Sequence, residues 1–122
     1  MFERSRNILD CHIAGFTYYD GLEVIDQLTL GAMVTLKAEP ENPYDPDAVA
    51  VYFGETKLGY IPRIKNNALS QLLYFGYGDI IEARISSRNL EAIPEVQFRI
   101  VIKLKDNRIN FLPPNNQNGS TA

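Results

Sequence analysis

The stretch Asn42–Val51, NPYDPDAVAV, is a polar corner that runs directly into alternating apolar residues. Pro43 and Pro46 fix their own φ angles and push the residue before each of them toward extended geometry, so Tyr44 is held between two constrained positions. The alternation predicts a β-strand over Ala48–Phe53. The corner is either a rigid turn whose Asp caps a backbone amide or a platform that aims side chains. In both cases it lies at the mouth of a sheet.

Hydrophobic periodicity predicts several strands of similar length. Period-two alternation indicates strands over Ile8–Thr17, Met33–Ala38, Ala48–Phe53, Lys57–Arg63, Ile80–Arg88 and Glu95–Lys105. Gly54 and Glu55, between the third and fourth of these strands, are a hairpin signal. We therefore expect neighbouring strands to pair in antiparallel fashion.

Two other segments have helical character. The apolar spacing predicts a helix over Lys65–Phe75, with Asn66 or Asn67 as its cap and Gly76 just beyond its end. The residues Leu22–Leu28 indicate a short helical or irregular segment. Six strands with one or two short helices predict a mainly β protein, built as a small antiparallel β-barrel.

The last predicted strand alternates most cleanly. Its apolar residues are expected to face the core: Val96, Phe98, Ile100, Ile102 and Leu104. Its outward residues are mostly basic: Gln97, Arg99, Lys103 and Lys105. Such a stripe fits contact with phosphate, and it equally fits a solvated strand face.

The chain has 122 residues, 45% of them hydrophobic, which is enough for one globular domain with its own core. No apolar run approaches the ~20 residues needed to span a bilayer, and the first residues lack the apolar stretch of a secretion signal. We therefore expect an intracellular, cytoplasmic protein without membrane contact. Residues 1–7 are expected to be a flexible N-terminus and residues 111–122 a disordered tail.

Cysteine and histidine are too few to build a metal site. Cys11 is the single cysteine and His12 the single histidine, so neither a disulfide framework nor a four-ligand zinc site is expected. His12 is expected to be a half-exposed strand residue. The sequence has no phosphate-binding glycine loop, nucleophile elbow or histidine-bearing triad. It therefore predicts a non-catalytic protein without cofactors.

The corner carries a cluster of carboxylates, at Glu39, Glu41, Asp45 and Asp47. Oxygen ligands of this kind suit Mg²⁺ or Ca²⁺. However, the spacing departs from that of the EF-hand loop, and prolines interrupt the segment where such a loop needs free backbone. We expect a solvated turn rather than a metal site.

Charge is distributed unevenly along the chain, whose net charge is −3. Residues 1–56 hold three Lys or Arg against ten Asp or Glu, whereas residues 57–122 hold nine against five. This asymmetry permits a locally basic groove on an acidic protein, and it equally permits a mixed, solvated surface.

Several spaced motifs follow one another in a fixed order. They are Gly31, Val34 and Leu36, then Glu39-Pro40, Asn42-Pro43-Tyr44-Asp45, Ala48-Val49-x-Val51 and Leu58-Gly59-Tyr60-Ile61-Pro62, with Ile13-Ala14-Gly15 and Tyr18-Tyr19 upstream. Together they resemble the HIRAN domain family. The resemblance covers Cys11 to Lys105 and implies a HIRAN domain over residues 8–110, with the OB-like β-barrel of that family.

The resemblance also implies a function. HIRAN domains occur alone in bacteria and attached to SNF2-type helicases in eukaryotes, where the best understood members bind single-stranded DNA and recognise its free 3′ end. A standalone, bacterial-type member is therefore expected to be a nucleic-acid-binding module in DNA repair or processing. Its implied partners are single-stranded DNA and helicase or nuclease proteins.

Carried over by position, the implied nucleic-acid site consists of Tyr18, Tyr19, Asn42, Tyr44, Asp45, Tyr60, Arg63 and Lys65. The resemblance implies stacking for the paired tyrosines and for Tyr44, a hydrogen bond from the terminal 3′-hydroxyl to Asp45, and phosphate contact for Arg63. Two positions depart from the end-binding members. Those members place an arginine where this chain has Thr17 and a histidine where it has Tyr60.

Other interpretations stay open. On composition alone, ordinary strand-end packing is the better interpretation of the paired tyrosines. The chain also fits a β-barrel that binds a protein partner through its aromatic corner, or an accessory, nuclease-like hydrolase that uses the acidic loop. Phosphate binding weakens steeply as salt rises and an apolar protein contact does not, so salt dependence separates nucleic-acid binding from protein binding.

Overall fold

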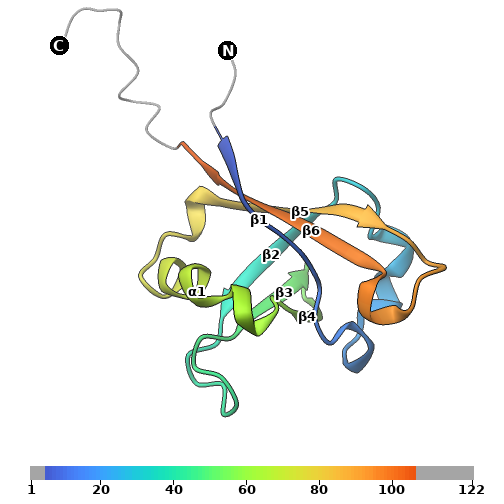
Figure 1. Ribbon diagram of the computed structural model, residues 1–122, viewed down its shortest axis with the longest axis horizontal. Helices are drawn as coiled ribbons and strands as arrows, with labels where there is room; N and C mark the ends of the chain where they lie inside the picture. Colours follow the sequence, from blue (N-terminus) through green and yellow to red (C-terminus); the bar gives the residue numbers. More distant parts are fainter. Residues whose placement is uncertain (1–4, 107–122) are drawn as a thin grey trace, which may run out of the picture.

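The computed structural model describes residues 5–106. Its strands are β1 (Ser5–His12), β2 (Met33–Ala38), β3 (Val49–Phe53), β4 (Thr56–Tyr60), β5 (Ile81–Arg88) and β6 (Phe98–Lys105). One α-helix, α1 (Asn67–Tyr74), lies between β4 and β5 (Figure 1). Short 3-10 helices fill the connections: η1 (Phe16–Tyr18), η2 (Gly21–Gln27), η3 (Arg63–Lys65), η4 (Gly78–Ile80) and η5 (Pro94–Val96). The predicted mainly β architecture, with six strands and the helix after the fourth, is confirmed.

The strands form one antiparallel sheet in the order β1-β6-β5-β2-β3-β4. Its edge strands, β1 and β4, are not paired along their length. Just beyond β1, Ala14 and Tyr60 exchange backbone hydrogen bonds of 2.8 and 2.9 Å and form an isolated bridge. The sheet is therefore not closed into the expected β-barrel. Closure fails because Gly15, with a φ of 73°, turns the chain into η1.

Glycine at position 59 permits the two edges to meet. Gly59 has a φ of 150°, and a Cβ built there would lie 2.3 Å from the carbonyl oxygen of Ala14. No side chain fits at that distance, so the close approach of the two backbones requires glycine. We call the line where β1 and β4 approach each other, at Ala14 and Tyr60, the seam of the sheet.

The core is built from the inward faces of the strands and from residues of the connections. Its buried members are Cys11, Ile13, Phe16, Leu28, Val34, Leu36, Val49, Val51, Leu58, Ile61, Leu69, Ala83, Ile85, Phe98, Ile100 and Ile102. Phe98 packs against Phe16 with 5.0 Å between ring centroids, and α1 packs against β2. The predicted inward positions of β6 are confirmed for Phe98, Ile100 and Ile102.

The structure corrects three expected strand boundaries. The first strand ends at His12 rather than Thr17. Arg63 lies in η3 and not at a strand end, because β4 stops at Tyr60. Val96, expected in the core, is 39% exposed. Proline at N1 starts η5 just before it, so β6 begins only at Phe98.

The N-terminal strand starts earlier than its sequence suggests. Residues 5–7 fall within the range expected to be flexible, yet they pair with residues 103–105 of β6. The expected tail at residues 111–122 lies outside the described residues. Within residues 5–106, no helix is long and apolar enough to cross a membrane.

Candidate functional site

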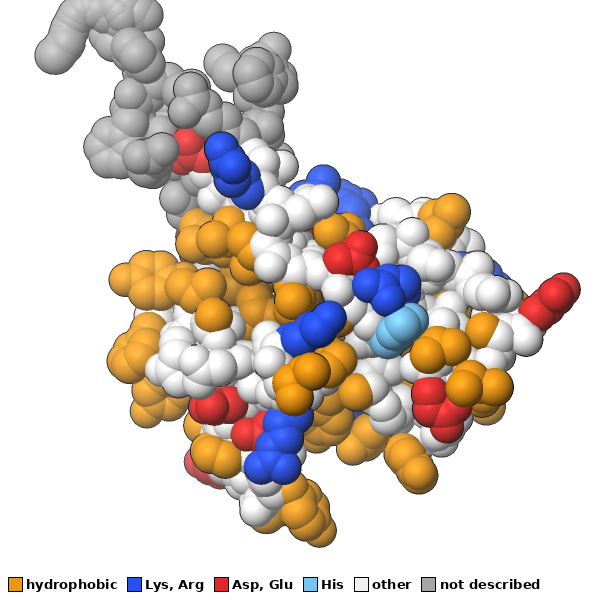
Figure 2. Space-filling view, in the orientation of Figure 1, with side chains coloured by type: hydrophobic (Ala, Val, Ile, Leu, Met, Phe, Trp, Pro, Cys, Tyr) orange, Lys and Arg blue, Asp and Glu red, His pale blue; other side chains and the backbone are white. Residues whose placement is uncertain are grey.

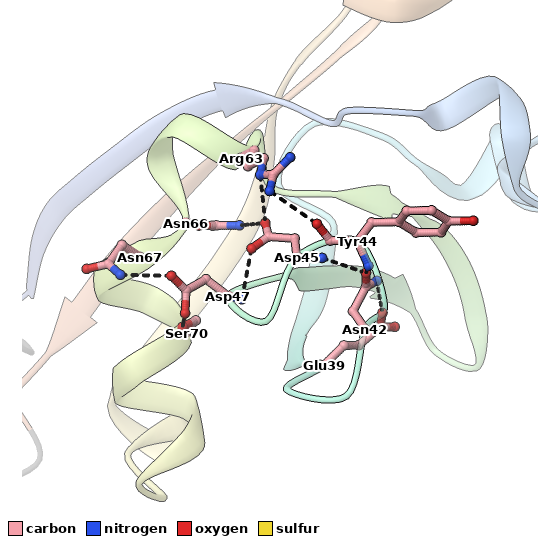
Figure 3. A network of polar contacts seen from close by, with 9 residues as sticks. All are labelled: Glu39, Asn42, Tyr44, Asp45, Asp47, Arg63, Asn66, Asn67 and Ser70. Atoms are coloured by element: carbon pink, nitrogen blue, oxygen red, sulfur yellow. Dashed lines mark hydrogen bonds and ion pairs between the residues drawn. The ribbon is translucent and has the colours of Figure 1, made fainter.

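The polar corner between β2 and β3 is held by hydrogen bonds from its own side chains (Figure 3). Asn42 Oδ1 accepts the backbone N–H of Tyr44 over 2.8 Å and that of Asp45 over 3.1 Å. Asp45 Oδ1 accepts the backbone N–H of Asp47 over 2.9 Å. These short-range bonds, in which Asn and Asp fold onto nearby amides, fix the turn that the sequence predicts. The ring of Tyr44 projects from it and is 85% exposed.

Asp45 also ties the corner to the segment that leads into α1. Its Oδ2 accepts a hydrogen bond of 2.9 Å from Asn66 Nδ2 and lies 3.7 Å from Nε of Arg63. The guanidinium of Arg63 donates a second bond, of 3.1 Å, to the carbonyl oxygen of Tyr44. Hydrogen bonds from Asn66 and from the amide of Asp47 lower the pKa of Asp45, so its carboxylate is ionised at neutral pH.

A second carboxylate fastens the corner directly to α1. Asp47 accepts a bond of 3.0 Å from Asn67 Nδ2 and one of 3.3 Å from Ser70 Oγ (Figure 3). Asn66 occupies the N-cap position of α1, as expected, but its side chain makes no capping bond. It is instead committed to Asp45, a partner 21 positions away that helix-cap rules do not reveal.

Beside the corner, three polar side chains bond to one another. We call Glu39, Lys57 and Tyr60 the triangle. Tyr60 donates a 2.7 Å bond to Glu39 Oε1, and Lys57 donates to both Glu39 Oε2 (3.0 Å) and the Tyr60 hydroxyl (2.6 Å). Burial alone raises the pKa of Glu39, but bonds from Tyr60 and Lys57 outweigh it and hold the pKa below its ordinary value. Although burial opposes its charge, bonds with Tyr60 and Glu39 raise the pKa of Lys57. The triangle therefore holds an ionised carboxylate and an ammonium.

Tyr19 packs on this triangle. Its ring meets that of Tyr60 edge to face, with centroids 5.6 Å apart. The ammonium of Lys57 lies 5.0 Å from the Tyr19 ring and 4.5 Å from the Tyr60 ring, which adds a cation–π contact to each. Tyr19 is therefore oriented before any ligand arrives.

The corner, the triangle and η3 surround a pocket of about 880 Å³. The predicted site residues that line it are Tyr19, Asn42, Tyr44, Asp45, Tyr60 and Arg63. Residues that sequence reasoning did not assign to a binding site also line it, among them Ala14, Glu39, Glu41, Ile61 and Asn66. The pocket thus combines aromatic faces, carboxylates that accept hydrogen bonds and one guanidinium.

Two predicted site residues lie outside the pocket. Tyr18 is 84% exposed at the end of η1 and does not line the pocket, although its neighbour Tyr19 does. Lys65 is exposed at the end of η3 and does not line the pocket. Of the two paired tyrosines, only Tyr19 therefore belongs to the pocket lining.

The acidic corner does not assemble a cation site within residues 5–106. No group of three His, Cys, Asp or Glu in this part of the chain is placed to hold a metal ion. Asp45 and Asp47 are instead occupied by donors from η3 and α1. The arrangement suits binding of a ligand that offers a flat ring, hydroxyl groups and a single anionic group.

One family model and one curated protein match this chain. The family model for the HIRAN domain matches residues 7–105. A Fanconi-associated nuclease 1 homolog from rice (Oryza sativa subsp. japonica) is 34% identical over 70 residues, which are 54% of this chain and 7% of that protein. The chain thus spans a small fraction of that relative.

Solved structures share the fold. A protein from Lactobacillus plantarum matches with a TM-score of 0.70 at 21% identity, over 87% of this chain and all of the other. The HIRAN domain of human HLTF matches with a TM-score of 0.57 at 22% identity, over 83% of this chain and 77% of the other. The overall fold is therefore shared with these two solved structures.

Proposed function

The chain belongs to the HIRAN domain family, and on that premise we propose that its pocket binds single-stranded DNA and receives the free 3′ end of the strand. The proposal places the protein in DNA repair or processing. It makes the pocket residues a binding site without catalytic groups, and it places the protein inside the cell.

The observation that carries this proposal is the exposure of the Tyr44 ring on a backbone that hydrogen bonds hold in place. Its ring is exposed on a corner whose backbone is held by Asn42 and, through Arg63, by η3. An exposed aromatic side chain on a fixed backbone offers a stacking surface for a base at little ordering cost. Tyr19 offers a second aromatic face in the same pocket.

The carboxylates of the pocket support recognition of a hydroxyl rather than a terminal phosphate. An ionised carboxylate only accepts hydrogen bonds, so it attracts a hydroxyl and repels a phosphate. Asp45 keeps acceptor capacity beyond its bonds to Asn66 and to the amide of Asp47, since two carboxylate oxygens offer about four lone-pair positions. Arg63 is the cation of the pocket lining that meets a neighbouring phosphate.

Two positions, Thr17 and Tyr60, differ from the end-binding members, and the contacts of Tyr60 indicate what replaces the missing histidine. Tyr60 stands where those members carry a histidine, and its hydroxyl is already engaged by Glu39 and Lys57. We therefore assign Tyr60 to orienting Tyr19 and Glu39 rather than to a phosphate. With Thr17 in place of an arginine, Arg63 carries the phosphate contact beside Tyr44.

Titration of the protein with labelled single strands tests the proposal. A linear strand with a 3′-hydroxyl is expected to bind more tightly than the same strand with a 3′-phosphate, and a circular strand is expected to bind most weakly. Binding should weaken as salt rises, because phosphate contacts release counterions. Equal affinity for linear and circular strands would refute end recognition, and salt-independent or absent binding would refute nucleic-acid binding itself.

A helicase or nuclease is the partner protein that this function calls for, since a module that holds a strand end does no chemistry on it. The rice relative carries the name of a nuclease, and the matching segment is a small part of its length. We propose that the present chain presents strand ends to an enzyme of that kind. A pull-down with 3′-ended single strands, compared with circular ones, would reveal a partner recruited by the bound end.

One observation supports a protein-binding function as the alternative. Tyr74, Phe75 and Tyr77, at the end of α1, are all exposed, and the first two rings pack edge to face with centroids 5.0 Å apart. This aromatic group lies outside the pocket lining. If it served the main function of the chain, Tyr74→Ala would abolish that function and Tyr44→Ala would not.

A further inference from the structure

The seam of the sheet places basic residues from three elements beside the pocket. Because Ala14 and Tyr60 form an antiparallel bridge, the residues before Ala14 run alongside those after Tyr60. His12 therefore lies next to the segment that enters η3. On its other side, the β1–β6 register pairs His12 with Arg99.

Basic side chains at this seam lie in a strip that starts at the pocket, and two of them, Arg63 and Arg99, are ion-paired with Asp45 and Asp10. Arg63 lines the pocket, and Lys65 follows two residues later on the same 3-10 turn. Arg99 Nη1 lies 3.3 to 3.4 Å from both ring nitrogens of His12. We call Arg63, Lys65, His12 and Arg99 the seam strip.

Electrostatic effects at the seam agree with this arrangement. Burial comes first among the causes that lower the pKa of His12, and the charges of Arg99 and Lys65 lower it further. Asp10 acts in the opposite sense and accepts a bond of 3.0 Å from Arg99. Lys65 has no side-chain hydrogen bond or ion pair among residues 5–106, so its ammonium is available to a ligand.

Figure 2 shows this face of the molecule. The pale blue side chain is the single histidine of the chain, and blue side chains lie beside it and in a row across the middle of the face. The blue side chains are separated from one another, with hydrophobic side chains between them and red side chains beside some of them. A nucleic-acid strand likewise carries its negative charges at intervals, one per nucleotide.

We propose that the seam strip binds the phosphates of the nucleotides on the 5′ side of the one in the pocket, so that a single strand leaves the pocket past Arg63 and crosses the seam over Lys65 toward Arg99. This inference rests on the proposed function and extends it, because it gives the strand a direction and makes the site longer than one nucleotide. It also gives Lys65, which lies outside the pocket, a place in binding.

The test compares a dinucleotide with an octanucleotide, both with a free 3′-hydroxyl, by fluorescence anisotropy over a series of salt concentrations. The pocket alone holds the dinucleotide, whereas the octanucleotide also reaches the strip. Each phosphate contact to a single strand changes the slope of log affinity against log salt by about 0.7. Contacts at Lys65 and Arg99 should therefore make the octanucleotide slope steeper than the dinucleotide slope by about 1.4.

Lys65→Gln should reduce the octanucleotide slope by about 0.7 and leave dinucleotide binding unchanged. Lys37→Gln is the matched control. It removes the same charge, but Lys37 sits over the ring of Tyr52 at 4.3 Å and does not line the pocket. Lys65→Arg should restore the parental slope.

Three results would overturn the inference. An octanucleotide that binds no more tightly than the dinucleotide would confine the site to the pocket and leave the proposed function intact. Equal effects of Lys65→Gln and Lys37→Gln on the octanucleotide slope would mean that Lys65 acts only through the net charge of the protein and not through a contact at the seam. Absence of binding to either ligand at any salt would remove the proposed function and this inference together.

Discussion

Asn66 and Asp45, which both line the pocket, are joined by a 2.9 Å hydrogen bond that the Asn66 side chain, at the start of α1, donates to the corner. Asn66 is only 3% exposed, so it has no access to water as an alternative partner. The corner that carries Tyr44 is thereby fixed to the element that carries Arg63. Ligand contacts from these two segments act as one rigid surface.

Asp45→Ala should abolish the preference for a 3′-hydroxyl over a 3′-phosphate and should also lower the melting temperature. The first effect follows from loss of an acceptor in the pocket, and the second from the buried amide of Asn66 left without its partner. Titration with the two strand ends measures the preference, and thermal unfolding measures the stability.

Asn66→Ala separates these two effects. It removes the same hydrogen bond and keeps the carboxylate, so it should lower the melting temperature while the end preference survives. If Asn66→Ala erased the preference as fully as Asp45→Ala, the carboxylate would act by holding the corner and not by meeting the hydroxyl.

Tyr44→Ala should weaken binding of single strands by about 1 to 3 kcal/mol, whatever the chemistry of the 3′ end, because stacking does not depend on the terminal group. The ring is exposed, so the melting temperature should stay within the range of surface substitutions. Tyr44→Phe keeps the stacking face and should bind like the parent. Unchanged affinity of Tyr44→Ala would assign the ring no part in binding.

Phe98→Ala should lower the free energy of unfolding by roughly 3 to 5 kcal/mol, because it empties a site in the core. Phe98 is 2% exposed and packs against Phe16. Val96→Ala, two positions earlier in the same alternating pattern, is the control. Since Val96 lies outside β6 and is partly exposed, its truncation should change stability by no more than about 0.5 kcal/mol. Urea unfolding measures both, and similar losses would contradict this placement of the strand.

Glu39 should make stability depend on pH in the acidic range. Its pKa in the folded protein is held below the ordinary value of 4.5, so its ionised form stabilises the fold at pH values above that value. This stabilisation is lost as pH falls through the lower, folded-state pKa. The free energy of unfolding of the parent should therefore fall between neutral pH and strongly acidic pH.

Glu39→Gln should make this decline shallower, because the group that binds the extra proton on unfolding is gone. Glu55→Gln, at the exposed turn between β3 and β4, is the matched control and should keep the parental pH profile. Urea unfolding at several pH values compares the three proteins. A Glu39→Gln profile that coincides with the parent would mean that the triangle with Lys57 and Tyr60 adds no pH-dependent stability.

Local patterns were sufficient to predict most of the fold. Alternation marks β6 because Phe98, Ile100 and Ile102 face one core, and the glycine at position 54 marks the hairpin. The pattern failed where backbone geometry overrides it. Val96 continues the alternation, but the preceding proline begins η5, and nothing in the apolar pattern distinguishes a 3-10 turn from the first residues of a strand.

The site was predictable where its residues belong to the corner motif, and the structure places Asn42, Tyr44 and Asp45 together at the pocket. It was not predictable where contacts join distant segments. The triangle joins Glu39 to Lys57 and Tyr60 across 18 and 21 positions. Such a contact depends on how β2 and β4 flank β3, and sheet order does not follow from the periodicity of single strands.

The pairing of β1 with β6 has a consequence for how the protein folds. Ser5 pairs with Lys105, so the first strand acquires its partner only after nearly the whole domain has been synthesised. Since synthesis adds about 5 to 20 residues per second, the backbone groups of β1 remain unpaired with β6 for roughly 5 to 20 s. Pairing of such distant residues is slow because the loop must close before any contact forms. β1 should thus be the last strand to join the sheet, and pulse-labelling hydrogen exchange during refolding should show its amides protected after those of the β2–β3–β4 hairpins.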